Sequence, residues 1–212
     1  MKRSAILSAG LILCLTGCTT VRDTLGYAPV IEQQENKHIT LKIKEFKDLR
    51  TEGEQIAKIR NLYGMPIVKV TTKESIPNWV ENALKMELSN AGYTIANSYG
   101  SEDYRIEGQV IKMFADGYFS YDACLVLNIA LKKEDQVIFQ KTYEATHDGQ
   151  VEDSEGKKQS FEYATFTERF KYDLQDICKH FIADINQHLL KSSNHTLKDA
   201  LPKIDKSPDT SS

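Results

Sequence analysis

The sequence has no excess of basic residues and no apolar segment long enough to span a membrane. In 212 residues, 27 Lys and Arg stand against 30 Asp and Glu, for a formal net charge of −3. Nucleic-acid-binding domains usually present a basic face, so this balance argues against nucleic acid as a partner. The apolar run from Ala5 to Leu15 is too short to cross a bilayer as a helix.

Catalytic and metal-binding signatures are also missing. The chain has no Gly-x-Ser-x-Gly, no P-loop and no Gly-x-Gly-x-x-Gly pattern. His180 and His188 are eight residues apart on one expected helix, too far for a shared metal ion. We therefore predict a non-enzymatic protein with no catalytic residues, no metal site and no cofactor.

The N-terminus has the layout of a secretory signal, because Lys2 and Arg3 precede the apolar run. The run ends in Leu15-Thr16-Gly17-Cys18, which resembles the lipobox of bacterial lipoproteins. The resemblance implies cleavage between Gly17 and Cys18, loss of residues 1–17, and acylation of Cys18. Several acyl chains anchor a protein stably, so the lipid bilayer is an expected partner. Thr19 stands where enterobacterial lipoproteins of the inner membrane have aspartate, which implies an outer-membrane lipoprotein whose domain faces the periplasm.

The rest of the chain divides into three segments. Residues 18–37 lack sustained periodicity and are interpreted as the lipidated N-terminus and a tether, although Val30 and Ile31 could already begin to pack. Residues 38–191 form the periplasmic domain. Residues 192–212 turn to Ser, Asn, Lys, Asp and Pro and are predicted to be a disordered tail.

Apolar periodicity predicts an α+β domain. Alternation indicates strands near 38–46 and 67–70, and then a three-stranded meander over 104–114, 119–131 and 137–146. Helical spacing predicts helices from Ser75 to Gly92 and from Thr165 to Lys191, with a short helical turn at 55–60. The short turns make the meander antiparallel. We expect a two-layer sandwich, with an antiparallel sheet covered on one face by both helices and a polar loop at 148–160.

Two cysteines remain in the domain, Cys124 and Cys178. Cys124 is expected on the sheet face opposite the buried residues of its strand, and Cys178 on the helix face that covers those residues. The sheet would then separate the two thiols, so we favour unpaired cysteines. A different helix position would allow a disulfide in the oxidising periplasm.

The layout resembles the YajG-type lipoproteins of Gram-negative bacteria. A lipobox leads to a strand, then Asp48-Leu49-Arg50, then a helix ending in Glu-Leu-Ser-Asn-Ala-Gly-Tyr at Tyr93, then a Tyr-Arg-Ile-Glu-Gly-Gln-Val strand and a closing helix. The resemblance covers residues 39–190 and implies no catalytic residues. Similar domains occur in accessory lipoproteins of envelope machines.

Four residues are candidates for contact with a partner: Asp48, Arg50, Tyr118 and Val126. Asp48 and Arg50 end a strand two residues apart, although Asp48 could simply cap the turn while Arg50 pairs with a carboxylate. Tyr118 and Val126 belong to the sheet face away from the helices, which is less polar than a freely solvated face. A loop or the tether could equally cover that face.

Two functions fit this description. The first is an accessory or structural subunit of an envelope assembly, such as a secretion or surface-appendage complex, acting through protein contacts. The second is a small-ligand module that holds a lipid or a cell-wall fragment. The second requires an apolar cavity under Trp79, Phe170 and Phe181.

Replacing the predicted acylation residue tests the anchor. Cys18→Ala should abolish incorporation of labelled fatty acid and the lipid attachment of the domain, because no other thiol occupies the lipobox position. Metabolic labelling and membrane fractionation measure both effects. Cys124→Ala is the matched control and should label as the wild type does; fatty acid retained by Cys18→Ala would contradict the lipobox assignment.

Overall fold

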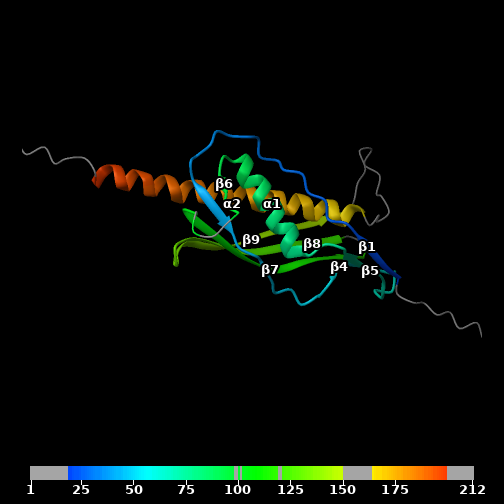
Figure 1. Ribbon diagram of the computed structural model, residues 1–212. Helices are drawn as coiled ribbons and strands as arrows, with labels where there is room; N and C mark the ends of the chain where they lie inside the picture. The colour runs from blue at the N-terminus through cyan, green and yellow to red at the C-terminus, as the bar shows by residue number, and fades with distance from the viewer. Residues whose placement is uncertain (1–18, 98–99, 101, 119–120, 150–163, 200–212) are drawn as a thin grey trace, which may run out of the picture.

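The long strand β7 (Tyr104–Gly117) is the centre of the sheet in the computed structural model, which describes residues 19–97, 100, 102–118, 121–149 and 164–199. On one edge β7 pairs antiparallel with β8 (Tyr121–Lys133), which pairs antiparallel with β9 (Gln136–Gly149). This is the predicted meander (Figure 1). β7 continues to Gly117, three residues past the end of the strand that the alternation predicts over 104–114.

The other edge of β7 carries three short strands one after another. β2 (Thr40–Ile43), β3 (Lys47–Asp48) and β4 (Gln55–Arg60) all run parallel to β7. β5 (Pro66–Thr72) pairs antiparallel with β4, and β6 (Thr94–Ile95) lies parallel beside β2. The sheet is therefore mixed, where antiparallel pairing was expected. Residues 55–60 form a strand and not a helical turn, because β5 and β7 satisfy their backbone hydrogen bonds.

Two helices cover one face of this sheet, as the α+β class predicts. α1 (Ile76–Asn90) has Pro77 in its first turn, and Gly92 follows it in the left-handed region with φ of 86°. α2 (Ala164–Asp199) packs against β8 and β9 and contacts α1. The helix continues to Asp199, so the disordered tail predicted from residue 192 was placed too early; residues 200–212 lie outside the described residues. So does 150–163, which holds most of the predicted polar loop.

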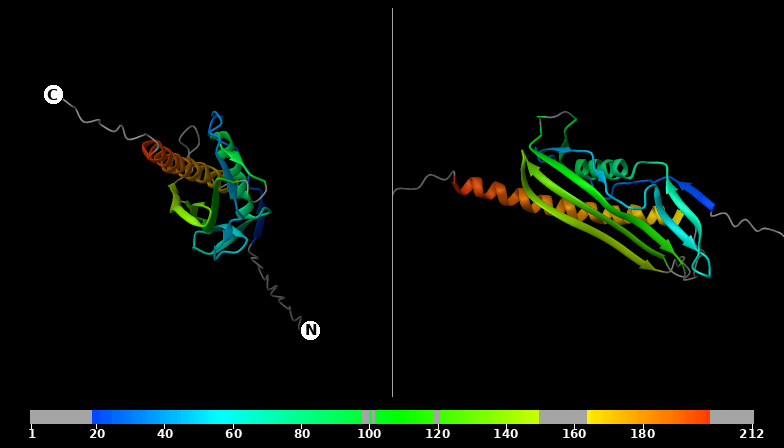
Figure 2. Two further views of the ribbon diagram at one scale, coloured as in Figure 1. Left: turned by 60° about the vertical axis from the view of Figure 1, so that its left-hand side comes forward. Right: turned by 90° about the horizontal axis from the view of Figure 1, so that it is seen from below.

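One core joins the layers. The inward side chains of β8, among them Leu125, Leu127 and Ile129, are fully buried against α2. Phe170 and Phe181 of α2 reach the same core, as do Trp79 and Leu84 of α1. Figure 2 shows both helices on one side of the sheet, with the opposite side of the meander turned outward.

The predicted tether is part of the domain. β1 (Thr19–Asp23) pairs in parallel with β5, and Thr19 lies opposite Val68. Residues 24–37, called the N-terminal strap below, then run back across the helices. The main chain of the strap is held at several points: Trp79 Nε1 donates to the Gly26 carbonyl at 3.2 Å and Gln175 Nε2 to the Ala28 carbonyl at 2.8 Å. The tether interpretation was therefore wrong, since these contacts come from helices distant in the sequence.

A buried carboxylate holds the middle of the strap. Glu87 of α1 has no exposed surface, and its two oxygens accept hydrogen bonds from the Tyr27 hydroxyl at 2.7 Å, Val30 N at 2.9 Å and Ile31 N at 3.0 Å. Burial, followed by the charges and hydrogen bonds around it, raises the pKa of Tyr27 well above its usual range, so the phenol stays a donor. The packing alternative considered for Val30 and Ile31 holds for Ile31, which packs against the core, whereas the Val30 side chain is exposed and only its main chain is held by Glu87.

Gly92 allows the strap to approach α1 closely. Lys37 N donates to the Gly92 carbonyl at 2.8 Å, and a Cβ on Gly92 would stand 2.1 Å from the Glu35 carbonyl oxygen. The positive φ and this close approach both require glycine here. The same residue therefore ends α1 and seats the strap.

Removing the Glu87 carboxylate should destabilise the protein. Glu87→Ala leaves three donors without their acceptor in a buried site, so the free energy of unfolding should fall by about 3 kcal/mol. Urea denaturation of the detergent-solubilised protein, followed by circular dichroism, measures this. Glu32→Ala, an exposed glutamate on the same strap, is the matched control and should change stability by less than about 0.5 kcal/mol. Equal effects of the two substitutions would contradict the role of Glu87.

Candidate interaction surface

Gly17 and Cys18, the predicted cleavage and acylation residues, lie outside the described residues, which begin with Thr19 in β1. Among the described residues, neither helix combines the length and the apolar character needed to cross a membrane.

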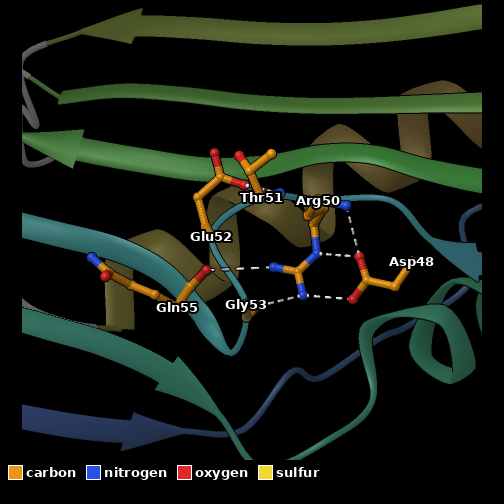
Figure 3. Close-up of polar contacts among 6 residues, drawn as sticks. All are labelled: Asp48, Arg50, Thr51, Glu52, Gly53 and Gln55. Carbon is orange, nitrogen blue, oxygen red and sulfur yellow. Dashed lines mark hydrogen bonds and ion pairs between the residues drawn. The ribbon is translucent and has the colours of Figure 1, made fainter.

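Asp48 and Arg50 bind each other. Nε and Nη2 of Arg50 donate to the two carboxylate oxygens of Asp48 at 2.9 and 2.8 Å, and Asp48 Oδ1 also accepts from Arg50 N at 3.1 Å (Figure 3). The guanidinium further donates to the carbonyl oxygens of Gly53 at 2.8 Å and Gln55 at 3.4 Å. The side chain of Arg50 is only 4% exposed as a result.

This pair closes the loop between β3 and β4. Burial alone would raise the pKa of the Asp48 carboxyl, but the hydrogen bonds from Arg50 hold that pKa below its usual value. Two interpretations of Asp48 and Arg50 were open: contact with a partner, or a turn with an ion pair inside the protein. The structure shows the turn and the ion pair. Leu49, which is half exposed, is an apolar residue of this loop at the surface, beside the exposed Thr51, Gly53 and Glu54.

Val126 lies on the outward face of the meander, between Lys112 of β7 and Glu144 of β9. It is half-buried, like Phe114 and Cys124. The neighbouring row is polar: the Asn128 amide donates to Thr142 Oγ1 at 2.9 Å and accepts from Gln140 at 2.6 Å. In the part of the chain that the structure describes, the helices and the strap lie on the other side of the sheet. The strap was one candidate to cover this face, and it does not.

An ion cluster lies on the same face, towards the start of β7. Glu107 of β7 binds Lys132 Nζ of β8 at 2.7 Å and Lys44 Nζ at 2.6 Å. These hydrogen bonds, that of Lys132 first, lower the pKa of Glu107 to about 2. The cluster ties the segment after β2 to the meander.

Tyr118 does not share a site with Val126. Its hydroxyl donates to the Leu62 carbonyl at 2.8 Å, so it packs beside the turn between β4 and β5. Val126 lies five residues into β8, roughly 17 Å along the strand from that end. The two predicted contact residues thus belong to separate surfaces.

The aromatic residues expected to surround a ligand are part of the packed core. Trp79 is 5% exposed and Phe170 and Phe181 are fully buried. Phe181 contacts the ring of Tyr143 edge-on at 5.8 Å between centroids. The space near Trp79 is an open surface cleft of about 400 Å³ beside the strap and α1. A larger open cleft of about 640 Å³ lies at the start of β7, near Tyr104. It is lined mainly by polar side chains, among them His38, Arg105 and Glu134.

Cys124 and Cys178 are unpaired, as predicted. Cys178 is a fully buried residue of α2, and Cys124 is half-buried on the outward face of the sheet. Burial raises the pKa of both thiols above the usual value, which keeps them protonated and poorly reactive. Within the described residues, no three His, Cys, Asp or Glu side chains gather in a way that could hold a metal ion.

The turn between β4 and β5 was missed by the sequence analysis. Leu62, Tyr63 and Met65 are 76%, 86% and 57% exposed, and Ile67 follows at 44%. The sequence had a signal here, since residues 61–67 contain no charged side chain. The interpretation of 55–60 as a helical turn hid the hairpin.

The fold and the N-terminal motif define a class, the α+β lipoproteins of the bacterial envelope. The chain belongs to the Lipoprotein_16 family, described as uncharacterized lipoprotein, whose model matches residues 27–187. A DUF330-family protein from Xanthomonas campestris has a similar structure, with a TM-score of 0.56, 14% identity, and 83% of this chain and 99% of that chain covered. A second similar crystal structure, of an uncharacterized protein, gives 0.50, 10% identity, and 80% and 99% coverage. Both show the fold alone. No curated protein matches the sequence.

The ion cluster at Glu107 should make stability depend on pH. Because the pKa of Glu107 in the folded protein is below that of the unfolded chain, its stabilising contribution is complete above about pH 4.5 and is lost as the pH falls towards 2. At pH 7, Glu107→Gln should reduce the free energy of unfolding by about 1 kcal/mol, a value discounted for solvent screening. The deficit should shrink as the pH falls below 4.5.

Urea denaturation between pH 7 and pH 3 measures this deficit. Glu45→Gln removes an exposed carboxylate from the neighbouring loop and serves as the control. A deficit of Glu107→Gln that stays constant over this pH range would contradict the assignment.

Proposed function

We propose that this chain is a non-enzymatic, YajG-type lipoprotein of the outer membrane, acylated at Cys18, whose domain faces the periplasm and is an accessory or structural subunit of an envelope assembly. A secretion or surface-appendage complex is the kind of assembly we have in mind. The family supports lipid anchoring in the bacterial envelope. The finer statements rest on the lipobox, on Thr19 and on the surfaces described above.

The observation that carries the proposal is the outward face of the meander. Three strands of 13 or 14 residues build it. Val126 and Phe114 contribute apolar surface among polar side chains that already bond to one another, so the face is rigid and of mixed polarity. Interfaces of non-obligate complexes have this composition. β9 adds an edge that pairs only with β8 among the described strands, and edge strands can accept a partner strand.

The small-ligand function has less support. Trp79, Phe170 and Phe181, which were to surround the ligand, fill the core between the layers. Both clefts described above are open to solvent; the cleft of about 640 Å³ is lined mainly by polar side chains, and the one beside Trp79 by polar and apolar side chains in similar number. Ligand pockets usually bury most of the ligand surface, which an open cleft does not do for a lipid tail.

A pull-down of the tagged, lipidated protein from cell envelopes in mild detergent tests the proposal. The wild type should recover a stoichiometric set of envelope proteins. Val126→Lys should reduce the recovery of that set at least tenfold, because burying an unpaired charge in an interface costs desolvation free energy. Tyr172→Lys, at an exposed aromatic residue of α2 on the helix layer, should retain it.

Thermal unfolding of both variants within a few degrees of the wild type shows that the fold is kept. Recovery of the protein alone, or equal recovery with both variants, would count against an assembly held by this face. A small molecule recovered with the protein would favour the ligand function.

A further inference from the structure

The predicted acylation site is next to the hairpin between β4 and β5. Thr19 is the register partner of Val68, and Cys18 is bonded directly to Thr19, so their Cα atoms are about 3.8 Å apart. The start of β1 and the end of this hairpin lie at the same end of the molecule (Figures 1 and 2). β5 turns back at Met65, three residues before Val68, so the hairpin extends roughly 10 Å past Thr19. Acyl chains on Cys18 would therefore hold the hairpin against the bilayer surface.

The hairpin tip, residues 61–67, is apolar where it meets solvent. Tyr63 is 86% exposed and Leu62 is 76% exposed. Met65 and Ile67 are exposed in the same segment, as is Tyr118, whose hydroxyl binds the Leu62 carbonyl. The tip carries no charge. Soluble proteins rarely leave such a contiguous apolar group uncovered, and tyrosine is enriched where membranes meet water.

The main chain of the tip is already hydrogen-bonded within the protein. Asn61 organises it: its N–H donates to the Met65 carbonyl at 2.9 Å, its carbonyl accepts from Gly64 N at 2.9 Å, and its side-chain oxygen accepts from Tyr63 N and Met65 N at 3.0 Å. Gly64 has φ of 78°, which this tight turn requires.

Side chains from the flanking strands satisfy two more carbonyl groups of the tip. Arg60 Nη1 donates to the Gly64 carbonyl at 3.0 Å, and the Tyr118 hydroxyl donates to the Leu62 carbonyl at 2.8 Å. Backbone that enters a lipid environment must have its polar groups satisfied internally. The tip meets much of this requirement while it exposes apolar side chains.

Basic side chains lie behind the tip. Lys58 and Lys69 are register partners on the outward face, and the alternation of each strand places Arg60 of β4 and Arg22 of β1 on that face too. Asp116 balances part of this charge through Lys58 at 2.8 Å and Arg60 at 2.7 Å. Lys69 and Arg22 are exposed. Basic residues in the strands behind an apolar tip can bind the phosphate groups of anionic lipids.

We propose that the β4–β5 hairpin tip is a membrane-contact element, which enters the headgroup region of the bilayer beside the acylated Cys18. The two contacts together fix the orientation of the domain. The far end of β7, with the polar cleft and the C-terminal part of α2, then points away from the membrane. This inference rests on acylation of Cys18 but not on any protein partner.

Tryptophan fluorescence in vesicles tests the proposal. The lipidated full-length Tyr63→Trp protein, with acylation verified by mass, is reconstituted into vesicles of phosphatidylethanolamine and phosphatidylglycerol that contain a nitroxide-labelled phospholipid. Tyr63 is so exposed that the substitution leaves the fold intact, and the native Trp79 is buried and contributes a constant background. We expect at least a twofold loss of the added emission with nitroxide lipid, and less quenching by aqueous iodide than for Val137→Trp in the same vesicles.

Val137→Trp is the matched control. Val137 is an exposed apolar residue at the opposite end of the meander, roughly 35 Å along β9 from the hairpin end. Its tryptophan should stay open to iodide and insensitive to the nitroxide lipid. The proposal is overturned if Tyr63→Trp behaves like Val137→Trp in vesicles. If the Tyr63→Trp emission is then shielded only in native envelopes, a protein and not the lipid surface covers the tip. Vesicles hold no partner, so this result is independent of the pull-down.

Discussion

The buried carboxylate of Glu87 is the interaction on which the arrangement of this protein depends. It accepts three hydrogen bonds from the strap, from Tyr27, Val30 and Ile31. A buried charge with satisfied partners is stable, whereas the same charge without them would be costly, so the strap and α1 require each other. Because the strap is held against α1, the strand β1 that precedes it lies beside β5, and Thr19, which follows the predicted acylation residue, is part of the sheet.

The sheet depends in the same way on β7. One edge of β7 pairs with β2, β3 and β4 in parallel, and its other edge pairs with β8, the next strand of the meander. The Asp48–Arg50 pair belongs to this scaffold, since it closes the loop that lets β3 and β4 follow one another along β7. The helices cover one face only, which leaves the outward face of β7, β8 and β9 as a rigid surface with no described element upon it.

These features place different surfaces at the two ends of the molecule. The end that holds Thr19 and the β4–β5 hairpin tip is the proposed membrane end. The opposite end, more than 30 Å away along the strands, holds the polar cleft. Between them runs the outward face with Val126. In the proposed orientation the domain presents its surfaces at a set height above the bilayer, and the function that we propose depends on position and contact more than on chemistry at one site.

The sequence by itself determined what local periodicity and local motifs encode: the alternating strands of the meander, the two amphipathic helices, the glycine that ends α1, and the lipobox. Tertiary structure alone decided the rest. The segment 55–60 is short, and its sequence favours neither helix nor strand clearly. Only its pairing with β5 and β7 makes it a strand. In the sequence, Glu87 cannot be distinguished from the other polar residues of its helix, because its burial depends on the strap. Residues 19–37 carry no periodic pattern, because their partners are strand β5, Glu74 and the two helices. These partners lie more than 45 residues away, and no short window along the sequence contains both.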